Sequence, residues 1–147
     1  MTDVQLSAQE VAERSCGSMW ARDEASRWLG LKLEEVAPGQ ATVSLKVEKH
    51  HTNGHGICHG GFIFTLADSA FALACNSYNQ TVVAQQNSIT FIAPARLDDL
   101  LVAEAREVCR SGRSGIYDVA VKNQKGELIA AFRGNSRQIK GQHFTQE

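Results

Sequence analysis

The alternation of hydrophobic and polar residues predicts one buried helix in the middle of the chain, with strands on both sides of it. Residues 62–75 contain no proline or glycine, and their only polar members are Thr65, Asp68 and Ser69. Alanine, leucine and phenylalanine dominate this run, which favours an α-helix of about four turns. A helix that is apolar on nearly every side is buried in the core and does not lie on the surface.

Before and after this helix the hydrophobic period is two, as expected for strands that bury one face. A hairpin with Pro38-Gly39 at its turn comes first, and an antiparallel meander of turn-linked strands is expected after the helix. The expected strands are residues 31–36, 41–47, 81–92, 100–109, 116–122 and 128–139. We therefore predict an α+β fold in which a curved antiparallel sheet wraps around one long helix.

The ends of the chain are expected to flank this core. The pattern S-A-Q-E at residues 7–10 is typical of a capping box and predicts short N-terminal helices, which Gly30 is expected to end. We expect Trp28 to pack in the core and the tail from Gly141 onward to fray.

Composition and charge narrow the class of protein. With 147 residues, of which 43% are hydrophobic, the chain is expected to form one domain, residues 1–147. Its net charge of −1 offers no general attraction to nucleic acid or to an anionic membrane. The apolar run is shorter than the ~20 residues that span a bilayer, and the N-terminus lacks the apolar stretch of a signal peptide. Four cysteines without metal or redox spacing fit reduced thiols, so we expect a cytoplasmic location.

The candidate chemistry is concentrated on the central helix and the loop before it. Asp68 is a carboxylate near the middle of an apolar helix, where it requires a partner, access to water or a catalytic role. At the start of the helix, Gly60 and Gly61 leave backbone N–H groups that suit an anion or a developing oxyanion. Gly60 and Asp68 lie roughly 12 Å apart along one helix, too far to act on one carbonyl. Either the two are unrelated, or a second copy of the chain supplies the other half of a site.

These residues belong to a longer pattern that resembles a known family. The pattern is Asn53-x5-His59-Gly60-Gly61-x6-Asp68, followed by a helix end LACNS and the stretches SITFIAP (88–94), SGRSGIYDV (111–119) and AAFRGNSR (130–137). It is similar to the hotdog-fold acyl-CoA thioesterases, and most similar to their phenylacetate-degradation (PaaI-type) branch. The similarity covers about residues 20 to 140 and implies the hotdog fold, with short N-terminal helices beside the wrapped helix.

The resemblance also implies roles for individual residues. The Gly60 N–H would hold the oxyanion of a thioester, and Asp68 of the partner subunit would act as general base or nucleophile. Asn53 would orient the water or the thioester, and His59 would hold the loop at the helix start by hydrogen bonding.

The resemblance further implies how the substrate is held and how chains assemble. Gly61 would contact the substrate, an aryl or arylacetyl ester of coenzyme A such as phenylacetyl-CoA or its hydroxylated derivatives. Independently of the resemblance, Arg113 in its glycine-containing turn is the arginine that we expect to contact the phosphates of coenzyme A. Coenzyme A is then part of the substrate, and no metal or other cofactor is expected. The implied assembly is a homodimer at minimum, paired further into a homotetramer, with no nucleic-acid or membrane partner.

This chain departs from the family pattern in one respect. Some related thioesterases place a serine or threonine near the carboxylate, where this chain has Ala72 on the helix and Ala84 on the next strand. Alternative residues for positioning the water are Gln85, Gln86 and Ser88.

Other interpretations of the same residues remain open at this point. A hotdog hydratase or dehydratase would use His59 and Asp68 as acid and base, and a non-catalytic module would only bind acyl-CoA. The four loop histidines resemble a metal cluster, although no carboxylate or thiolate completes a known ligand pattern; they are His50, His51, His55 and His59. Cys58 precedes His59, but adjacent side chains do not normally point at each other, so a Cys–His nucleophile is not expected. The candidate cations for the phosphates of coenzyme A are Arg110, Arg113, Arg133 and Arg137.

Overall fold

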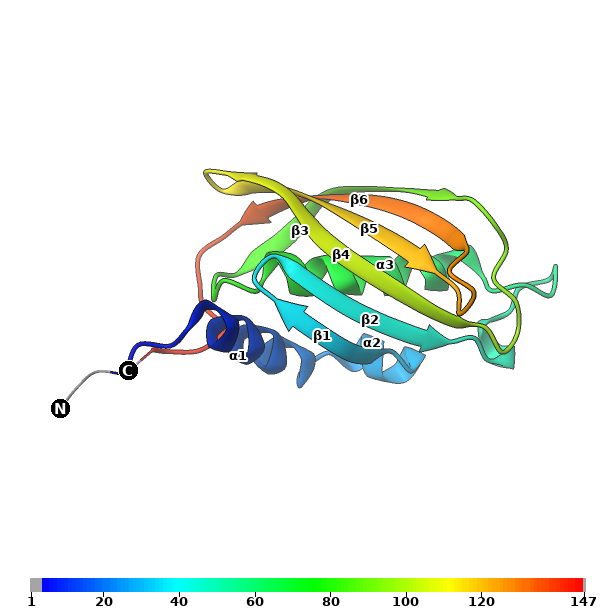
Figure 1. Cartoon of the computed structure of the whole chain (residues 1–147), viewed down its shortest axis with the longest axis horizontal. Coiled ribbons are helices and arrows are strands. Elements are labelled where there is room, and N and C mark those ends of the chain that lie inside the picture. The colour runs from blue at the N-terminus through cyan, green and yellow to red at the C-terminus, as the bar shows by residue number, and fades with distance from the viewer. Residues whose placement is uncertain (1–3, 147) are drawn as a thin grey trace.

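One long helix lies inside the curve of a six-stranded antiparallel sheet in the computed structural model of the chain, which describes residues 4–146 (Figure 1). The helix is α3 (Gly60–Cys75), and the strands are β1 (Lys32–Ala37), β2 (Gln40–Lys46), β3 (Val82–Phe91), β4 (Leu100–Ser111), β5 (Ser114–Lys122) and β6 (Leu128–Gln138). The predicted α+β fold is confirmed, and every strand end lies within two residues of the expected one.

The helix α3 supplies the centre of the hydrophobic core. Its buried residues are Ile63, Leu66, Ala67, Ala70, Phe71, Leu73, Ala74 and Cys75. The Phe71 ring meets the rings of Tyr117 and Phe132, with centroids 5.6 Å and 5.9 Å away. In contrast, Asp68 and Ser69 are only half-buried, so the polar stripe of the helix lies along the margin of the core.

The N-terminal helices begin and end at the expected residues. Helix α1 (Ala8–Trp20) begins after Ser7, whose hydroxyl accepts the Glu10 N–H while the Glu10 carboxylate accepts the Ser7 N–H. Helix α2 (Glu24–Leu29) ends at Gly30, which has a φ of +87° that favours glycine. Both capping predictions are confirmed. Among the described residues, none of the helices has the length and apolar character needed to cross a membrane.

The strand order differs from a simple meander. The order across the sheet is β1-β2-β4-β5-β6-β3, so only β4, β5 and β6 follow one another as neighbours. Strand β3 lies at the far edge beside β6, and residues 92–99 lead back across the sheet to β4. Three strand spacings amount to roughly 14 Å, which eight residues of extended chain can reach. The expectation that all strands after the helix are neighbours in succession was therefore wrong for β3.

Trp28 is exposed rather than part of the core. Its exposed fraction is 74%, and its ring lies against Phe62, with centroids 6.5 Å apart. The reason is the short length of α2, which buries only Ser26 and Leu29 and directs Trp28 away from the sheet.

The tail from Gly141 is held against the protein rather than frayed. The His143 ring lies within hydrogen-bond distance of the Asn76 side-chain oxygen, at 2.8 Å, and the Asn79 side chain donates to the Phe144 carbonyl at 3.0 Å. Two carboxamides at the end of α3 thus anchor residues 143–144, which lie beside α1 (Figure 1).

Candidate functional site

The start of α3 leaves one backbone donor without an acceptor. The His59 ring nitrogen Nδ1 accepts the Gly61 N–H at 2.9 Å, and the His59 carbonyl accepts the N–H groups of Phe62 and Ile63. Within residues 4–146, no acceptor is found for the Gly60 N–H. Because the positive end of the helix dipole reinforces this donor, the site favours a carbonyl oxygen that gains negative charge.

The loop before α3 is folded by its own polar groups. The Asn53 side-chain oxygen accepts the N–H groups of His55 and Ile57, at 2.9 Å and 3.4 Å. The His51 carbonyl accepts the His59 N–H at 2.8 Å and so ties the loop to the helix start. Asn53 therefore lies near Gly60, with its oxygen used to shape the loop.

An open cavity of about 520 Å³ lies beside this loop. Its lining is mainly apolar and consists of Asn53, Ile57, Cys58, Gly60, Ile63, Phe91, Ile92, Ala93, Pro94 and Ala95. The Phe91 ring covers Gly60 so closely that a Cβ atom at residue 60 would lie 2.9 Å from it. Glycine at this position thus allows an aromatic ring and a ligand to approach the backbone donor.

Asp68 lies two turns further along the same helix and is bonded to a neutral side chain. The Asn87 Nδ2 amide on β3 donates to Asp68 Oδ1 at 2.8 Å. Burial raises the pKa of the Asp68 carboxyl group, and the hydrogen bond from Asn87 opposes this rise. A carboxylate with a raised pKa is better matched to general-base work near neutral pH than an exposed one.

The Asp68–Asn87 contact was not foreseen from the sequence. Gln85, Gln86 and Ser88, the alternatives considered there, are exposed, and Gln86 instead accepts a hydrogen bond from Asn135 at 2.6 Å. The alternation of side chains along β3 could have indicated that Asn87 faces α3, because Asn87 lies on the same face of the strand as Ile89 and Phe91. The register shift between Ala84 and Gln86 interrupts that alternation before Asn87 and hides it.

Gly60 and Asp68 lie at opposite ends of one contact between α3 and β3. Phe91 covers Gly60, and Asn87 contacts Asp68. From residue 87 to 91 the strand advances roughly 13 Å, while the helix advances roughly 12 Å from residue 60 to 68. The two groups therefore remain apart along the whole contact, and one chain does not bring them to the same carbonyl carbon.

The structure separates the four candidate arginines into two kinds. Arg133 forms a two-point ion pair with Asp118, at 2.7 Å and 2.9 Å, and Arg110 pairs with Glu107 at 3.0 Å while lying over the Tyr78 ring. Arg113 and Arg137 are exposed and form no ion pair within residues 4–146. Arg113 lies in the β4–β5 turn, beside Tyr78 at the C-terminal end of α3 and far from Gly60 of the same chain.

Two of the loop histidines, His51 and His59, are held by hydrogen bonds, and Cys58 is buried. His51 is buried, accepts the Glu48 N–H at 2.9 Å, and lies 2.9 Å from the Leu29 carbonyl. Burial raises the pKa of the Cys58 thiol to about 11, so it stays protonated at neutral pH. In the part of the chain that the structure describes, no group of three or more His, Cys, Asp or Glu residues could hold a metal ion.

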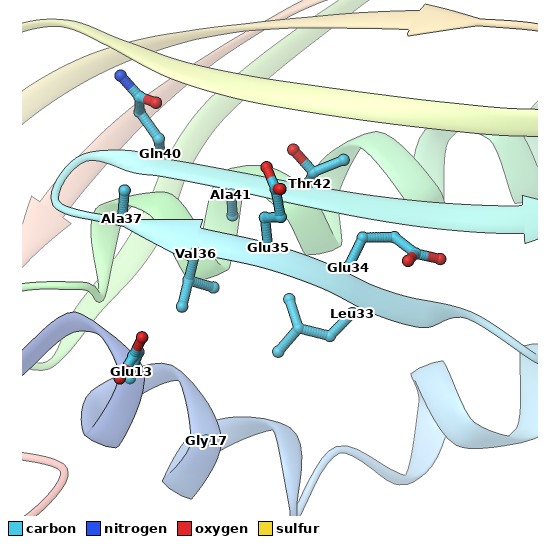
Figure 2. Close-up of a pocket in the computed structure, with 10 residues that line it drawn as sticks. All are labelled: Glu13, Gly17, Leu33, Glu34, Glu35, Val36, Ala37, Gln40, Ala41 and Thr42. Atoms are coloured by element: carbon cyan, nitrogen blue, oxygen red, sulfur yellow. The ribbon is translucent and has the colours of Figure 1, made fainter. Parts of the chain in front are cut away.

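A second hollow, of about 490 Å³, lies between α1 and the β1–β2 hairpin (Figure 2). Leu33 and Val36 point across it toward Glu13 and Gly17 of α1. Glu34 and Glu35 also line it, so three carboxylates surround this hollow. Such a lining repels an anionic ligand, and none of the predicted site residues lies in it.

Comparisons with known proteins point to one family. Residues 55–130 match the thioesterase superfamily. The chain is 37% identical over 130 residues to acyl-coenzyme A thioesterase PaaI of Escherichia coli strain K12, which covers 88% of this chain and 93% of that protein. The structure of the E. coli PaaI protein from the phenylacetic acid degradation operon has a TM-score of 0.91 and 36% identity, over 92% of this chain and 99% of that one.

Two further similar proteins are also described as thioesterases. Acyl-coenzyme A thioesterase 13 of Homo sapiens is 33% identical over 137 residues, which cover 90% of this chain and 95% of that protein. A hypothetical thioesterase of Streptococcus pneumoniae TIGR4, solved with coenzyme A, has a TM-score of 0.72 and 28% identity over 76% of this chain and 87% of that one.

Proposed function

Because the chain belongs to the thioesterase superfamily and is an acyl-CoA thioesterase, we propose that it hydrolyses aryl or arylacetyl-CoA esters at a site shared by two subunits. The observation that carries the proposal is the unused Gly60 N–H at the start of α3, next to an apolar cavity. This N–H would donate a hydrogen bond to the thioester carbonyl oxygen and stabilise the negative charge that develops on it. Removing one such donor costs on the order of 10²–10³-fold in turnover.

Asp68 would supply the base or the nucleophile. As a base, its carboxylate takes a proton from water while the water oxygen attacks the carbonyl carbon; the C–S bond then breaks and the proton passes to the departing thiolate. As a nucleophile, the carboxylate attacks the carbonyl carbon, the C–S bond breaks and the thiolate of coenzyme A departs, leaving an anhydride that water hydrolyses in a second step to the free acid and the Asp68 carboxylate. The raised pKa of Asp68 supports the first role, since a carboxylate held in a partly buried site is a stronger base.

A two-fold symmetric pair of chains would bring these groups together. If Asp68 of one subunit lies level with Gly60 of the other, the same contact occurs twice, as an isologous interface requires. Cys75, which lines the same small hollow as Arg113, lies roughly 10 Å beyond Asp68 along the axis of α3. Arg113 of the partner would then lie about that distance beyond Gly60, which suits a contact with the phosphates of coenzyme A. We propose that two such dimers pair further, through a second interface, into a homotetramer.

Three further features fit the proposed substrate and setting. The apolar cavity beside Gly60, with the Phe91 ring at its wall, suits an aromatic acyl group better than a charged one. Asn53 would orient the thioester or water at the cavity mouth, and Gly61 would contact the substrate beside Gly60. We also propose a cytoplasmic location, which suits the four free cysteines.

The substrate proposal is tested by measuring thiol release from a panel of aryl-, arylacetyl- and alkyl-CoA esters. We expect arylacetyl or aryl esters to have the highest kcat/KM. Asp68→Asn should lower kcat by at least about 10²-fold, the scale of a lost general base. The matched control is Asp98→Asn, because Asp98 is exposed and its φ of +72° is tolerated by asparagine. Equal loss in both variants, or a preference for long alkyl esters, would overturn this part of the proposal.

The shared site is tested with mixed dimers of two inactive variants, Asp68→Ala and Gly60→Pro. Proline removes the N–H of residue 60, and His59 already has the extended backbone, φ −62° and ψ 131°, that precedes proline. Gly60→Ala is the control, because it pushes on Phe91 equally but keeps the donor. Random exchange makes about half the dimers mixed with one intact site each, so roughly a quarter of wild-type activity should return. No recovery in a sample with demonstrated mixed dimers would assign the site to a single subunit.

A further inference from the structure

The Asp68 carboxylate has a single hydrogen-bond donor among the described side chains, and that donor is a carboxamide. Asn87 Nδ2 donates to Asp68 Oδ1 at 2.8 Å, while no hydrogen-bond donor within residues 4–146 is found for Asp68 Oδ2. A carboxamide stays neutral at every working pH, so its N–H groups donate whatever the protonation state of their surroundings. The contact therefore fixes one carboxylate oxygen and leaves the other for a reacting group.

The position of Asn87 is fixed by close packing between the sheet and α3. Asn87 lies directly opposite Gly134 of β6, so both face the helix. A Cβ atom at Gly134 would lie 2.6 Å from the Phe71 ring, so the helix meets the sheet backbone at this point. Phe71 is one turn after Asp68 on the same helix, and this close approach brings the Asp68 carboxylate within reach of Asn87.

Asn87 is also held at a cost to stability. Its own oxygen, Oδ1, is buried and has no hydrogen-bond donor in the described part of the chain. An unpaired buried acceptor destabilises the folded state, so packing alone would favour an apolar side chain here. Asparagine is advantageous at this position for its contact with Asp68.

We propose that Asn87 is the positioning residue for Asp68, holding Oδ1 of the carboxylate so that Oδ2 faces the reacting water or thioester. The proposal rests on the proposed catalytic role of Asp68. Asn87 on β3 thus supplies the polar contact to the carboxylate that a serine or threonine would supply at position 72 or 84. Ala72 and Ala84 cannot supply it, because alanine has no polar side chain. The hydrogen bond also favours the ionised form of the carboxyl group and so opposes burial, which raises its pKa.

Among the described residues near Asp68, no charged side chain takes the place of Asn87 in favouring the ionised form of the Asp68 carboxyl group. Strand β3 has no charged residue between Val82 and Phe91, and the thiol of Cys75, which interacts with Asp68, stays protonated because burial raises its pKa to about 12. In α2, Asp23 is bonded to Ser26, which meets Ser69 at 3.3 Å.

The other titratable side chains on the elements packed against α3 are directed elsewhere. Those on β1, β2, β4, β5 and β6 are exposed, apart from Glu107 and Tyr117. The Glu107 carboxylate accepts hydrogen bonds from the hydroxyls of both Tyr117 and Tyr78 beyond the far end of the helix. The exposed ones are Lys32, Glu34, Glu35, Lys46, Glu104, Arg106, Cys109, Arg110, Asp118, Lys122, Arg133 and Arg137.

The test compares Asn87→Ala and the isosteric Asn87→Asp with a control, Asn135→Ala. Asn135 is a carboxamide on the neighbouring strand that donates to Gln86 and not to Asp68. Loss of a hydrogen bond to a charged group should lower kcat of both Asn87 variants by about 10- to 100-fold, with a smaller change in KM. The acid limb of the kcat/KM profile should move to higher pH, because Asp68 loses its donor in one variant and gains a second carboxylate in the other. Asn135→Ala should leave the acid limb in place.

The outcome separates this inference from the function on which it rests. If Asp68→Asn is inactive while both folded Asn87 variants keep wild-type kcat and an unmoved acid limb, the positioning role is wrong and the role of Asp68 stands. If the Asp68→Asn variant hydrolyses CoA esters at the wild-type rate, the proposed catalytic role of Asp68 is wrong, and the positioning role of Asn87 is refuted with it. Should Asn87→Ala melt below the assay temperature, the isosteric Asn87→Asp decides the question, because its effect on the acid limb does not depend on side-chain volume.

Discussion

Replacing Gly134 with alanine would put a methyl group into space that the Phe71 ring occupies. The added Cβ atom would lie 2.6–2.7 Å from three ring carbons. The ring itself is fully buried and is enclosed by Tyr117 and Phe132, so it has little room to move aside. Overpacking of this kind costs about 1–3 kcal/mol, because the helix or the sheet has to shift.

The expected loss is measurable by thermal unfolding. For a chain of about this size, 1 kcal/mol corresponds to roughly 2–4 °C, so the melting temperature should fall by about 2–12 °C. The kcat should fall as well, since a shift of α3 away from β6 also separates Asp68 from Asn87. The matched control is Gly17→Ala in α1, where an added Cβ atom meets nothing within 4 Å. That variant should be more stable than the wild type by about 0.5–1 kcal/mol, because alanine favours the helix.

A second substitution tests whether the ring is the cause. Phe71→Leu alone should destabilise the protein by leaving a cavity, whereas Phe71→Leu combined with Gly134→Ala should recover part of both losses. The reasoning is refuted if Gly134→Ala unfolds at the wild-type temperature. Strictly additive effects of the two substitutions would refute it too, since the predicted clash couples the two residues.

Three further outcomes can be measured on single samples. Arg113→Ala should raise KM for CoA esters more than it lowers kcat, because a phosphate contact is remote from the bond that breaks; a kcat loss at unchanged KM would contradict it. Activity should survive extensive dialysis against a chelator, and a loss that zinc or another ion restores would show that the loop histidines bind a metal. Asp68→Asn should raise the free energy of unfolding at neutral pH, because the raised folded-state pKa of Asp68 means that its charged form destabilises the fold. That gain is present above the folded-state pKa and should shrink to nothing as the pH falls below the unfolded-state pKa; a gain that persists in acid would contradict the linkage.

The elements of this fold were predictable because local signals determine them. Alternating side chains and turn residues such as Pro38-Gly39 define the strands, and capping groups at Ser7 and Gly30 define the helix ends. Strand order was not predictable in the same way, since β3 pairs with β6 through residues about fifty positions apart in the chain. The turn-linked pattern favoured neighbours in sequence, and only the long-range pairing decides otherwise.

The site was partly predictable for a related reason. Gly60, His59 and Asp68 belong to one continuous segment, so their relation to the helix follows from helical geometry. Asn87 contacts Asp68 from another element, the strand β3. The register shift in β3 determines which face of the sheet Asn87 lies on, and no residue type in the sequence indicates that shift. The anchored tail is a similar case, because His143 meets Asn76 only after the whole sheet has formed.

The two edges of the sheet differ in a way that bears on the proposal of a site shared by two subunits. At one edge, β1 carries Lys32, Glu34 and Glu35, and charges of this kind prevent another strand from pairing there. At the other edge, β3 has no charge and no proline, and Val83 and Phe91 are large exposed apolar side chains. An edge strand without charges or proline can pair with a strand of another chain, and β3 of a second copy would satisfy two-fold symmetry. Since β3 also contacts both Gly60 and Asp68, pairing along this edge would cover the exposed strand and bring two chains together beside both halves of the site.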